Sequence, residues 1–315
     1  MKNKISIVII GAGNMSREYI KVFHYNKKFE IKAVVGRSKK KLKLLSKKFP
    51  KLIFTSEINK IFKKYKIDLT VICVSESQVL RVTKLISKFK TTILFEKPVG
   101  VNFFETEKII RIIKKAKIKS FVSLNRRFYQ STLIGKKLIN NKVGKRFIFI
   151  NDSQDEKKMK KIKKVKKVYK NTMYSNSIHL IDYFNIFGRG KIIKIINYKK
   201  FEASKPSRVI SLLYFSSGDL GLYHARWDKN EKWEASIFSK KIAFSLKPLE
   251  KITIIKNIGN QKIKKNYNAI DLKYKPGLFQ ISKELQKFFE KRKNNLINLK
   301  IYFKTVKLIK EIYQK

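Results

Sequence analysis

Short apolar runs alternate with amphipathic segments over the first 124 residues of the chain. The amphipathic segments repeat apolar residues every three to four positions, as a helix with one buried face requires. Strand, helix and strand in repeated succession predict crossover units and a doubly wound parallel sheet. The expected strands are ISIVII (5–10), IKAVV (31–35), LTVICV (69–74), TTILF (91–95) and SFVSL (120–124). The expected helices are MSREYIKVFHY, KKLKLLSKKF, SQVLRVTKLISKF and ETEKIIRIIKKA.

The rhythm changes after residue 125. Six strand-like runs with turn residues between them favour a mostly antiparallel sheet, and RFIFI precedes them. The six runs are KIIKIINY, SRVISLLYF, GDLGLYHARW, WEASIFS, KIAFSL and KITIIKN. Helices are expected near 129–141, 178–187, 278–291 and 296–313. The segment DKNEK between Trp227 and Trp233 is expected to turn a hairpin, with core packing as the role of both tryptophans. The fold class is therefore α/β, with domains at 1–124 and 125–315.

The charge balance is unusual. The 315 residues include 76 Lys+Arg and 22 Asp+Glu, a formal net charge of +54, and a surface of this kind attracts anions, including phosphorylated cofactors and substrates. Only 11 of the basic residues are arginine, and the lysines are spread along the chain. A/T-rich codons produce such a composition, so we expect no specific nucleic-acid partner. The densest lysine run, 155–170, is expected to be a solvated loop or exposed helix.

Cysteine content and hydropathy limit the possible sites and compartments. Cys73 is the single cysteine, which excludes an internal disulfide and a zinc site, and its apolar run predicts a small buried thiol. We expect no metal. The opening MKNKISIVIIGAG imitates a signal peptide, but its apolar run has six residues and its glycines suit a turn. No run approaches the roughly 20 apolar residues that span a bilayer, so a cytoplasmic protein without a membrane span is expected.

The turn GAGNMS (11–16) follows the first expected strand and opens a helix, a context that favours dinucleotide binding. Gly11 permits a tight turn, and Gly13 lets a pyrophosphate approach the backbone. The N–H groups and dipole at the helix start, where Asn14 and Met15 lie, then hold the anion. A glycine turn without any ligand is the alternative.

The end of the second expected strand bears on the choice of cofactor. Dinucleotide folds that prefer NAD place an acid there to accept hydrogen bonds from the ribose 2′-hydroxyl. This chain has Arg37 and Ser38 instead, followed by further lysines. A guanidinium and a hydroxyl suit a 2′-phosphate, so the sequence favours NADP(H) over NAD(H). The alternative is that Arg37 is a solvated loop residue.

The stretch FEKPVG (95–100) ends another expected strand. The carboxyl ends of strands in a doubly wound sheet face the cofactor crevice, so Lys97 is expected to point toward the nicotinamide. A lysine in a partly dry site can donate to a hydroxyl or carbonyl oxygen. Pro98 fixes the backbone, and Glu96 is expected to hold the carboxamide side of the ring or to fix the lysine.

Taken together, these motifs resemble the glucose-fructose oxidoreductase / inositol dehydrogenase / MocA (Gfo/Idh/MocA) family of NAD(P)-dependent oxidoreductases. The resemblance covers nearly the whole chain, through GAGNMS, FEKP, SLNRRF (123–128) and SIHLIDYF (177–184) in that order. It implies a Rossmann domain at 1–124 and a substrate-binding α/β domain at 125–315. In many members the open sheet of that second domain is the oligomer interface, which implies a homodimer or homotetramer. The typical reaction is hydride transfer between C–OH and C=O on a sugar, cyclitol or nucleotide sugar.

The resemblance also implies catalytic roles. Lys97 matches the family's EKP lysine, which polarises or protonates the reacting oxygen, and His179 matches the acid/base histidine. Many members have an aspartate four residues before that histidine, where this chain has Ser175. Either Asn176 or Ser175 then replaces the acid by hydrogen bonding, or His179 binds substrate without moving protons. Asp182, one turn after His179, could orient the imidazole instead.

A second departure from the family pattern is VSESQ (74–78), which lacks the proline and histidine common there and leaves details of the nicotinamide pocket open. Ser75 in this segment is an expected cofactor contact. Arg126 and Tyr174 are expected substrate contacts, with an interdomain ion pair as the alternative for Arg126. No role is assigned to His24 or His224.

Three functions compete. The first is a sugar or nucleotide-sugar dehydrogenase or reductase that uses Lys97 and His179. The second is a cofactor-binding protein on the same scaffold without efficient turnover, for which Ser175 is the sequence argument. The third is a polyanion-binding protein, against which the absence of a basic arm or recognition motif counts.

Overall fold

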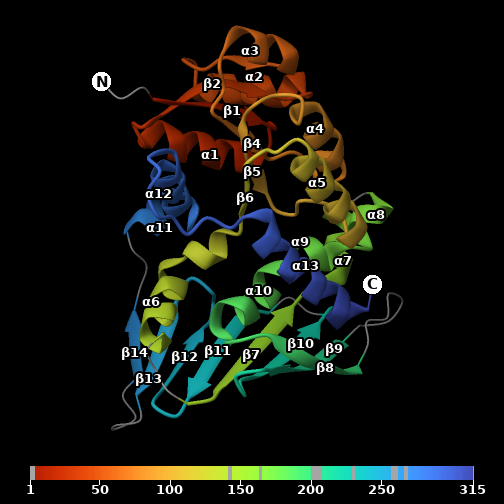
Figure 1. Cartoon of the computed structure of the whole chain (residues 1–315), viewed down its shortest axis with the longest axis vertical. Coiled ribbons are helices and arrows are strands. Elements are labelled where there is room, and N and C mark those ends of the chain that lie inside the picture. Colours follow the sequence, from red (N-terminus) through yellow and green to blue (C-terminus); the bar gives the residue numbers. More distant parts are fainter. Residues whose placement is uncertain are drawn as a thin grey trace. The chain divides into compact units, whose positions relative to one another are not determined.

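The computed structural model describes residues 4–140, 144–162, 165–199, 208–228, 231–256, 262–265 and 269–314. These residues form two compact units, one from 1–125 and 273–303 and the other from 126–272 and 304–315 (Figure 1). Residues 273–303 therefore pack into the first unit rather than with the chain that precedes them. None of the helices in the described ranges has the length and apolar character needed to cross a membrane.

Unit 1 is built on a six-stranded sheet with the order β3-β2-β1-β4-β5-β6, in which every described pair of neighbours is parallel. This confirms the expected doubly wound sheet. The strands are β1 (Ile5–Ile10), β2 (Phe29–Val35), β3 (Phe54–Thr55), β4 (Leu69–Ile72), β5 (Thr92–Glu96) and β6 (Ser120–Ser123). The helices are α1 (Asn14–Tyr25), α2 (Lys39–Lys48), α3 (Ile58–Lys64), α4 (Val79–Ile86), α5 (Phe103–Lys115) and α12 (Leu278–Phe289), with a 3₁₀ turn at Glu76–Gln78.

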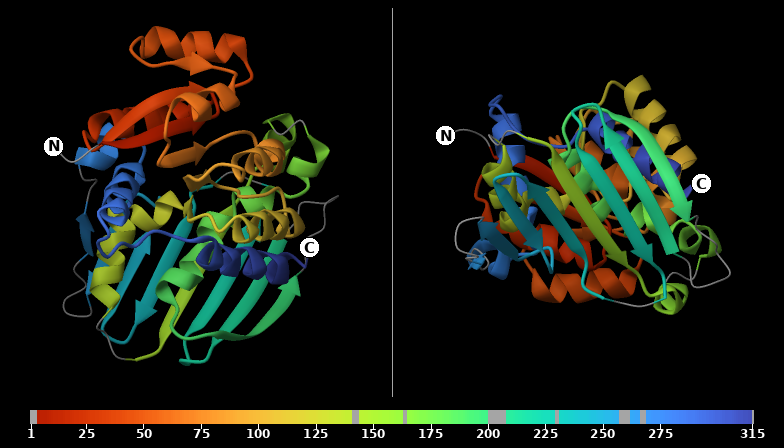
Figure 2. Two further views of the ribbon diagram at one scale, coloured as in Figure 1. Left: turned by 45° about the horizontal axis from the view of Figure 1, so that its top comes forward. Right: turned by 90° about the horizontal axis from the view of Figure 1, so that it is seen from below.

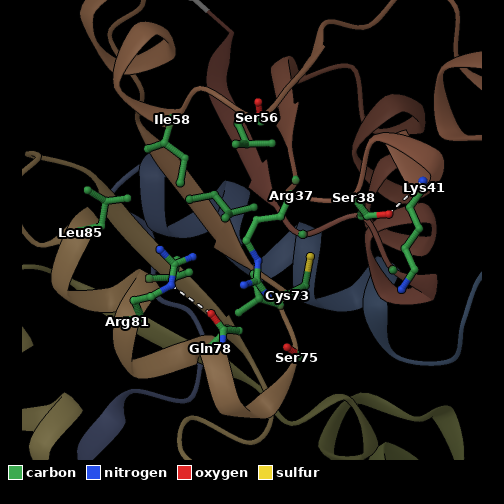
Figure 3. Close-up of a pocket in the computed structure, with 18 of the residues that line it drawn as sticks. Arg37, Ser38, Lys41, Ser56, Ile58, Cys73, Ser75, Gln78, Arg81 and Leu85 are labelled. Atoms are coloured by element: carbon green, nitrogen blue, oxygen red, sulfur yellow. Dashed lines mark hydrogen bonds between the residues drawn. The ribbon is translucent and has the colours of Figure 1, made fainter. Parts of the chain in front are cut away.

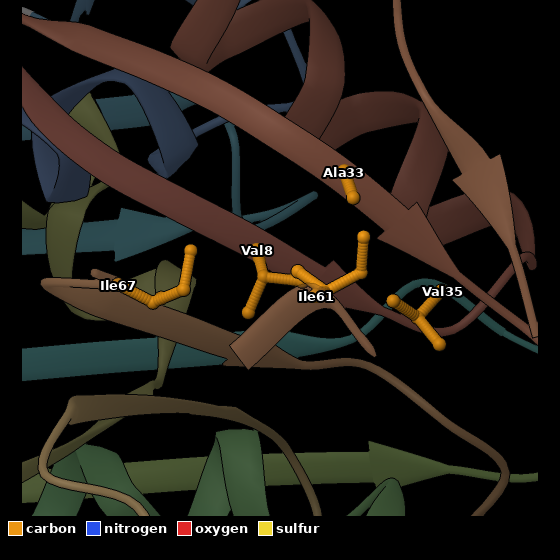
Figure 4. Close-up of a cluster of buried hydrophobic side chains, with 5 residues drawn as sticks. All are labelled: Val8, Ala33, Val35, Ile61 and Ile67. Atoms are coloured by element: carbon orange, nitrogen blue, oxygen red, sulfur yellow. The ribbon is translucent and has the colours of Figure 1, made fainter. Parts of the chain in front are cut away.

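The β3–α3 connection was not foreseen, because β3 has only two residues and both are half-buried. Ile61 of α3 nevertheless packs with Val8, Ala33, Val35 and Ile67 in a buried cluster on the sheet (Figure 4). Each such side chain contributes about 1.5–3 kcal/mol when removed from water. The packing of α3 against the sheet therefore stabilises the β3 segment in place, although β3 is too short to be recognised as a strand from the sequence.

The returning segment closes the β6 edge of the same sheet. Val122 N–H donates to the carbonyl of Ile297 at 2.7 Å, and Phe121 forms an antiparallel bridge with Asn298. The side chain of Asn125 donates to the carbonyl of Pro276 at 3.0 Å. A covered edge has no free row of backbone groups for another strand to pair with.

Unit 2 contains an eight-stranded sheet with the order β14-β13-β12-β11-β7-β10-β9-β8. Only β7 and β10 pair in parallel, so the expected mostly antiparallel sheet is confirmed. Its first four strands in chain order are β7 (Arg146–Ser153), β8 (Ile192–Lys199), β9 (Arg208–Phe215) and β10 (Leu220–Arg226). The others are β11 (Glu234–Ser239), β12 (Ile242–Leu246), β13 (Ile252–Lys256) and β14 (Lys262–Lys265), of which β14 was not predicted.

The hairpin expected between Trp227 and Trp233 is wrong. Strand β7 lies between β10 and β11 and pairs with both, with Leu220 opposite Phe147 and Glu234 opposite Asn151. The backbone of β7 forms hydrogen bonds with β10 along one edge and with β11 along the other. The seven residues from 227 to 233 are longer than a tight hairpin turn, so the connection does not force β10 and β11 to pair with each other. Trp227 is buried, as expected of a core residue.

Helices α6 (Gln130–Ile139) and α10 (Ile178–Phe187) pack on one face of this sheet, α6 against β12 and β13 and α10 against β7 and β11. The other helices of unit 2 are α7 (Glu156–Ile162), α8 (Lys166–Tyr169), α9 (Thr172–Ser175) and α11 (Ala269–Lys273), with a 3₁₀ turn at Asn125–Phe128 and α13 (Leu299–Tyr313) shared between the units. Helix α10 packs closely, because a Cβ on Gly221 of β10 would lie 2.6 Å from the Phe184 ring. On the other face, no described helix lies over β7, β10 or β9 (Figure 2).

Candidate active site

The glycine turn between β1 and α1 is shaped for close approach. Gly11 has φ +133°, and a Cβ there would lie 2.3 Å from the carbonyl oxygen of Cys73. Around the position that a Gly13 Cβ would take, no described atom lies within 4 Å. The N–H of Gly13 donates to Ser16 Oγ at 3.2 Å at the start of α1. Space beside Gly13 at a helix N-terminus is what a pyrophosphate requires.

A pocket of about 570 Å³ opens at the carboxyl ends of β1, β2 and β4 (Figure 3). A volume of this size is typical of small-molecule and cofactor sites. Five of the expected cofactor residues line it: Gly11, Gly13, Arg37, Ser38 and Ser75. Three others do not, since Asn14 and Met15 lie in the first turn of α1 and Glu96 ends β5.

Several cations of the pocket were missed by sequence reasoning. Lys41, Lys60 and Arg81 line it together with Arg37. Arg37 and Arg81 extend toward one another from opposite walls, and Arg81 Nε donates to Gln78 Oε1 at 3.0 Å (Figure 3). The signal was available for Arg81, because it lies in the first turn of the helix that follows β4, and such turns face the crevice. For Lys60 no signal existed, since β3 was not recognised.

The thiol of Cys73 also lines the pocket, and Sγ lies 3.2 Å from Ser16 Oγ. Burial raises the pKa of Cys73 to about 12, although the Ser16 hydrogen bond opposes the shift. A thiol with such a pKa stays protonated at neutral pH and is a poor nucleophile. This agrees with the structural role expected for Cys73.

The EKP stretch is held firmly within unit 1. The register Ile72↔Phe95 between β4 and β5 places Lys97 one residue beyond the strand end, beside the segment that lines the pocket. Val99 N–H donates to Tyr302 Oη at 3.1 Å, and Val101 N–H donates to Glu105 Oε2 at 2.6 Å. The Lys97–Pro98 peptide bond is cis. These contacts fix the backbone from which the lysine side chain projects.

Glu96 has partners of its own. Tyr19 Oη donates to Glu96 Oε2 at 2.5 Å. Burial raises the pKa of Glu96, while the positive charge of Lys97, the Tyr19 hydrogen bond and the charge of Lys275 oppose that rise. Tyr19 therefore binds the carboxyl group directly, and the expected role of Glu96 in fixing Lys97 stays a prediction.

His179 lies in unit 2 on α10 and is 3% exposed. Asp182, on the same helix, accepts hydrogen bonds from Arg127 Nε at 2.5 Å and Nη2 at 2.6 Å and from Thr305 Oγ1 at 2.7 Å. Burial would lower the pKa of Arg127, but the charge and hydrogen bonds of Asp182 raise it overall. Arg127 and Thr305 therefore supply the hydrogen bonds that stabilise the buried carboxylate of Asp182.

The residues before α10 form a polar group that is buried except for Asn176, which is half-buried. Ser175 Oγ donates to the Thr172 carbonyl at 3.0 Å within its own helix. Asn176 Nδ2 donates to Gln154 Oε1 at 3.2 Å, and Met159 Sδ lies 3.4 Å from the same nitrogen. Tyr174 is buried, and burial raises its pKa.

Arg126 lies in a separate, smaller pocket of unit 2. Its guanidinium stacks over Trp233, 4.7 Å from the ring centroid, and also lies 5.9 Å from the Tyr129 ring. Glu231 and Pro248 complete a pocket of about 200 Å³ around it. Trp233 donates from Nε1 to the Ser153 carbonyl at 2.8 Å, which fixes this stack on β7.

The expected site residues thus fall into two groups. The cofactor residues and Lys97 belong to unit 1, whereas His179 and the substrate residues belong to unit 2. Asn176 and Arg126 both neighbour the end of β7, through Gln154 and Trp233. The approach of Lys97 to His179 stays a prediction.

Comparison with known proteins agrees with this architecture. A family described as an oxidoreductase family with an NAD-binding Rossmann fold matches residues 5–124. No curated protein sequence matches the chain. Among solved structures, a dehydrogenase from Chromobacterium violaceum is similar with a TM-score of 0.84 and 15% identity, covering 100% of this chain and 95% of that one.

Two further similar structures have names that mention nucleotide sugars. UDP-N-acetylglucosamine 3-dehydrogenase GnnA from Acidithiobacillus ferrooxidans has a TM-score of 0.78 and 11% identity, covering 98% of this chain and 96% of that one. The WlbA dehydrogenase from Bordetella pertussis, in complex with NADH and UDP-GlcNAcA, has a TM-score of 0.74 and 12% identity, covering 99% and 96%. At these identities the likeness establishes the fold.

Proposed function

We propose that the protein is an NADP(H)-preferring dehydrogenase or reductase of the Gfo/Idh/MocA family that acts on a nucleotide sugar, starting from the match of residues 5–124 to an oxidoreductase family with an NAD-binding Rossmann fold. The observation that carries the proposal is the pocket at the ends of β1, β2 and β4, with an open approach at Gly13 and basic side chains around it. The bound nicotinamide would supply the hydride acceptor or donor.

The chain's own residues supply the proton chemistry in this proposal. Lys97 donates a hydrogen bond to the reacting oxygen of the sugar, which stabilises negative charge as a carbonyl is reduced. His179 gives a proton to that oxygen or removes one, according to direction. Glu96 holds the lysine in place, and the contacts of Val99 and Val101 fix its backbone.

The basic side chains support NADP(H). Ser38 accepts the Lys41 N–H at 3.3 Å as the cap of α2, so its hydroxyl hydrogen is available to a phosphate oxygen. Arg37 reaches into the pocket from the same turn, and Arg81 approaches from the opposite wall (Figure 3). Guanidinium groups bind phosphate oxygens through charge-assisted hydrogen bonds.

Replacing Arg37 by alanine is expected to raise the KM for NADPH about 10- to 100-fold, because a hydrogen bond to a charged group contributes about 1.5–3 kcal/mol. The KM for NADH should change little, since NADH has no 2′-phosphate. Initial rates with both cofactors measure this. Arg111→Ala is the matched control, because Arg111 is exposed on α5 outside the pocket. A wild-type protein that prefers NADH would contradict the assignment.

The nucleotide-sugar class is supported by the names of the two similar structures and by the net charge of +54, which favours anionic substrates. Purified protein is expected to oxidise or reduce one member of a panel of UDP-linked sugars with NADP(H), followed at the nicotinamide absorbance. Cofactor binding without turnover on the whole panel would instead favour a non-catalytic member of the fold.

We further propose that the protein is a homo-oligomer through the open face of the unit 2 sheet. Outward positions on this face are apolar and only half-buried, among them Phe147, Phe149, Leu212 and Leu222. Apolar surface of this kind favours association. Sedimentation equilibrium on the purified protein would detect the oligomer, and a monomer at micromolar concentration would rule it out.

A further inference from the structure

A buried carboxylate in unit 2 has no part in the chemistry described above. Asp152 lies near the end of β7 and is 0% exposed. Its side chain is on the face of the sheet that buries Ile148 and Ile150. A charge in such a place is costly unless hydrogen-bond donors surround it. The structure provides those donors.

Three side chains donate to Asp152. Tyr223 Oη donates to Oδ2 at 2.7 Å, and Gln154 Nε2 donates to Oδ1 at 2.6 Å. Ser177, the residue before α10, is the third donor, and Arg126 contributes positive charge nearby. Burial raises the pKa of Asp152, and the Ser177, Tyr223 and Gln154 hydrogen bonds limit that rise. Gln154 directly follows β7, whereas Tyr223 belongs to β10 and Ser177 precedes α10, so the carboxylate links β10 and the start of α10 to β7.

The chemistry of the groups sets the direction of the hydrogen bonds. A carboxylate only accepts, so the NH₂ group of Gln154 must face Asp152. The Gln154 carbonyl then faces the other way, and it accepts from Asn176 Nδ2 at 3.2 Å. The NH₂ group of Asn176 donates both to Gln154 and to Met159 Sδ, so the carbonyl oxygen Oδ1 is the part of the amide that can accept a hydrogen bond from another group.

Asn176 is well placed to use that oxygen. It is half-buried, and its backbone carbonyl accepts the N–H of His179 at 3.3 Å at the first turn of α10. Ser177, next in the chain, is bound both to Asp152 and to Tyr313 Oη, at 3.3 Å from the latter. The carboxylate therefore acts on the two residues from which the histidine helix starts.

We propose that Asp152 is a positioning residue, which through Gln154 turns the amide of Asn176 so that Oδ1 accepts a hydrogen bond from a hydroxyl group of the sugar substrate. This inference rests on the proposed function. Position 175, four residues before His179, has serine where many members of the family have an aspartate. In this proposal Asp152 of β7 supplies a carboxylate near the start of α10 instead. Asp152 itself touches no substrate in this arrangement.

Gln154→Met tests the link, because methionine has a similar length and cannot bridge Asp152 and Asn176. The KM for the sugar substrate is expected to rise about tenfold, which corresponds to about 1.4 kcal/mol, while the KM for NADPH stays the same. The double variant Asp152→Asn with Gln154→Glu reverses the polar groups but still presents an acceptor to Asn176. It is expected to restore the KM to within about twofold of wild type.

The same variants separate positioning from mere packing. A structural role would lower Tm in Gln154→Met without changing the sugar KM, and that outcome would overturn the proposal. A sugar KM of the double variant as high as that of Gln154→Met would also overturn the proposal. Should the wild-type protein turn over no substrate, the proposed function fails by itself. The positioning can then be measured without substrate, as slow hydrogen exchange of the Asn176 side-chain amide by NMR. Exchange equally slow in Gln154→Met would overturn it.

Discussion

Replacing Lys97 by alanine should lower kcat about 10²- to 10³-fold, the typical loss when one hydrogen-bond donor to a developing oxyanion is removed. The cofactor pocket lies at the ends of β1, β2 and β4, and Lys97 is not among its lining residues, so the Kd for NADPH should stay within about threefold of wild type. Single-turnover kinetics with the best sugar substrate, together with fluorescence titration of NADPH, measure both quantities.

Two further variants sharpen the test of Lys97. Lys97→Arg keeps the positive charge but cannot release its proton, so strong impairment of this variant would separate proton transfer from simple charge stabilisation. Lys90→Ala is the matched control, because Lys90 is exposed and precedes β5 at its other end. Turnover by Lys97→Ala equal to that of Lys90→Ala would exclude the lysine from catalysis.

Replacing Asp182 by alanine should cost about 3 kcal/mol of unfolding free energy, at the lower end of the range for breaking a buried ion pair. The carboxylate is 2% exposed and the Arg127 side chain 16%, so the variant leaves a guanidinium in the protein interior without its partner. The lower end applies because water reaches part of Arg127. The melting temperature should fall by about 6–12 °C, measured by calorimetry.

The exposed pair Arg111–Glu107 provides the comparison for Asp182. Glu107→Ala removes an i,i+4 ion pair whose arginine is 72% exposed, and it should cost no more than about 0.5 kcal/mol. Arg127→Met combined with Asp182→Leu should recover much of the loss, since no charge is then left buried. Equal melting temperatures for Asp182→Ala and Glu107→Ala would show that the buried pair does not stabilise unit 2.

Local patterns were sufficient for most of the fold. The strands of unit 1 are buried on both faces and read as continuous apolar runs, which is why five of them could be placed within a few residues. The sixth, β3, is two residues long and depends on Ile61 of α3 packing against β1 and β2. No sequence window contains that contact.

The hairpin error has a related cause. The sequence shows which residues form β10 and β11, but strand pairing is a choice among partners far apart in the chain. Here β7 takes the place between them because both of its edges find partners. Adjacent strands often pair with one another, and only the assembled sheet shows an exception.

For the candidate site, chemistry with a local signature could be anticipated. Three motifs can each be recognised within a few residues of sequence: the glycines at a strand-to-helix turn, Arg37 and Ser38 at a strand end, and the EKP stretch. Lys60 and the Asp152–Gln154–Asn176 chain have no such local signature, because they are defined by contacts between separate elements.

The sequence by itself determined the alternation of elements, the two sheet types, the glycine turn and the residue types offered to a cofactor. Those features follow from backbone stereochemistry and side-chain burial, which act over a few residues. The tertiary structure alone decided that Asp182 pairs with Arg127, that β7 separates β10 from β11, and that a buried carboxylate lies under the start of the histidine helix. These depend on which distant groups share the low-dielectric interior, where an unpaired charge or amide is too costly to remain.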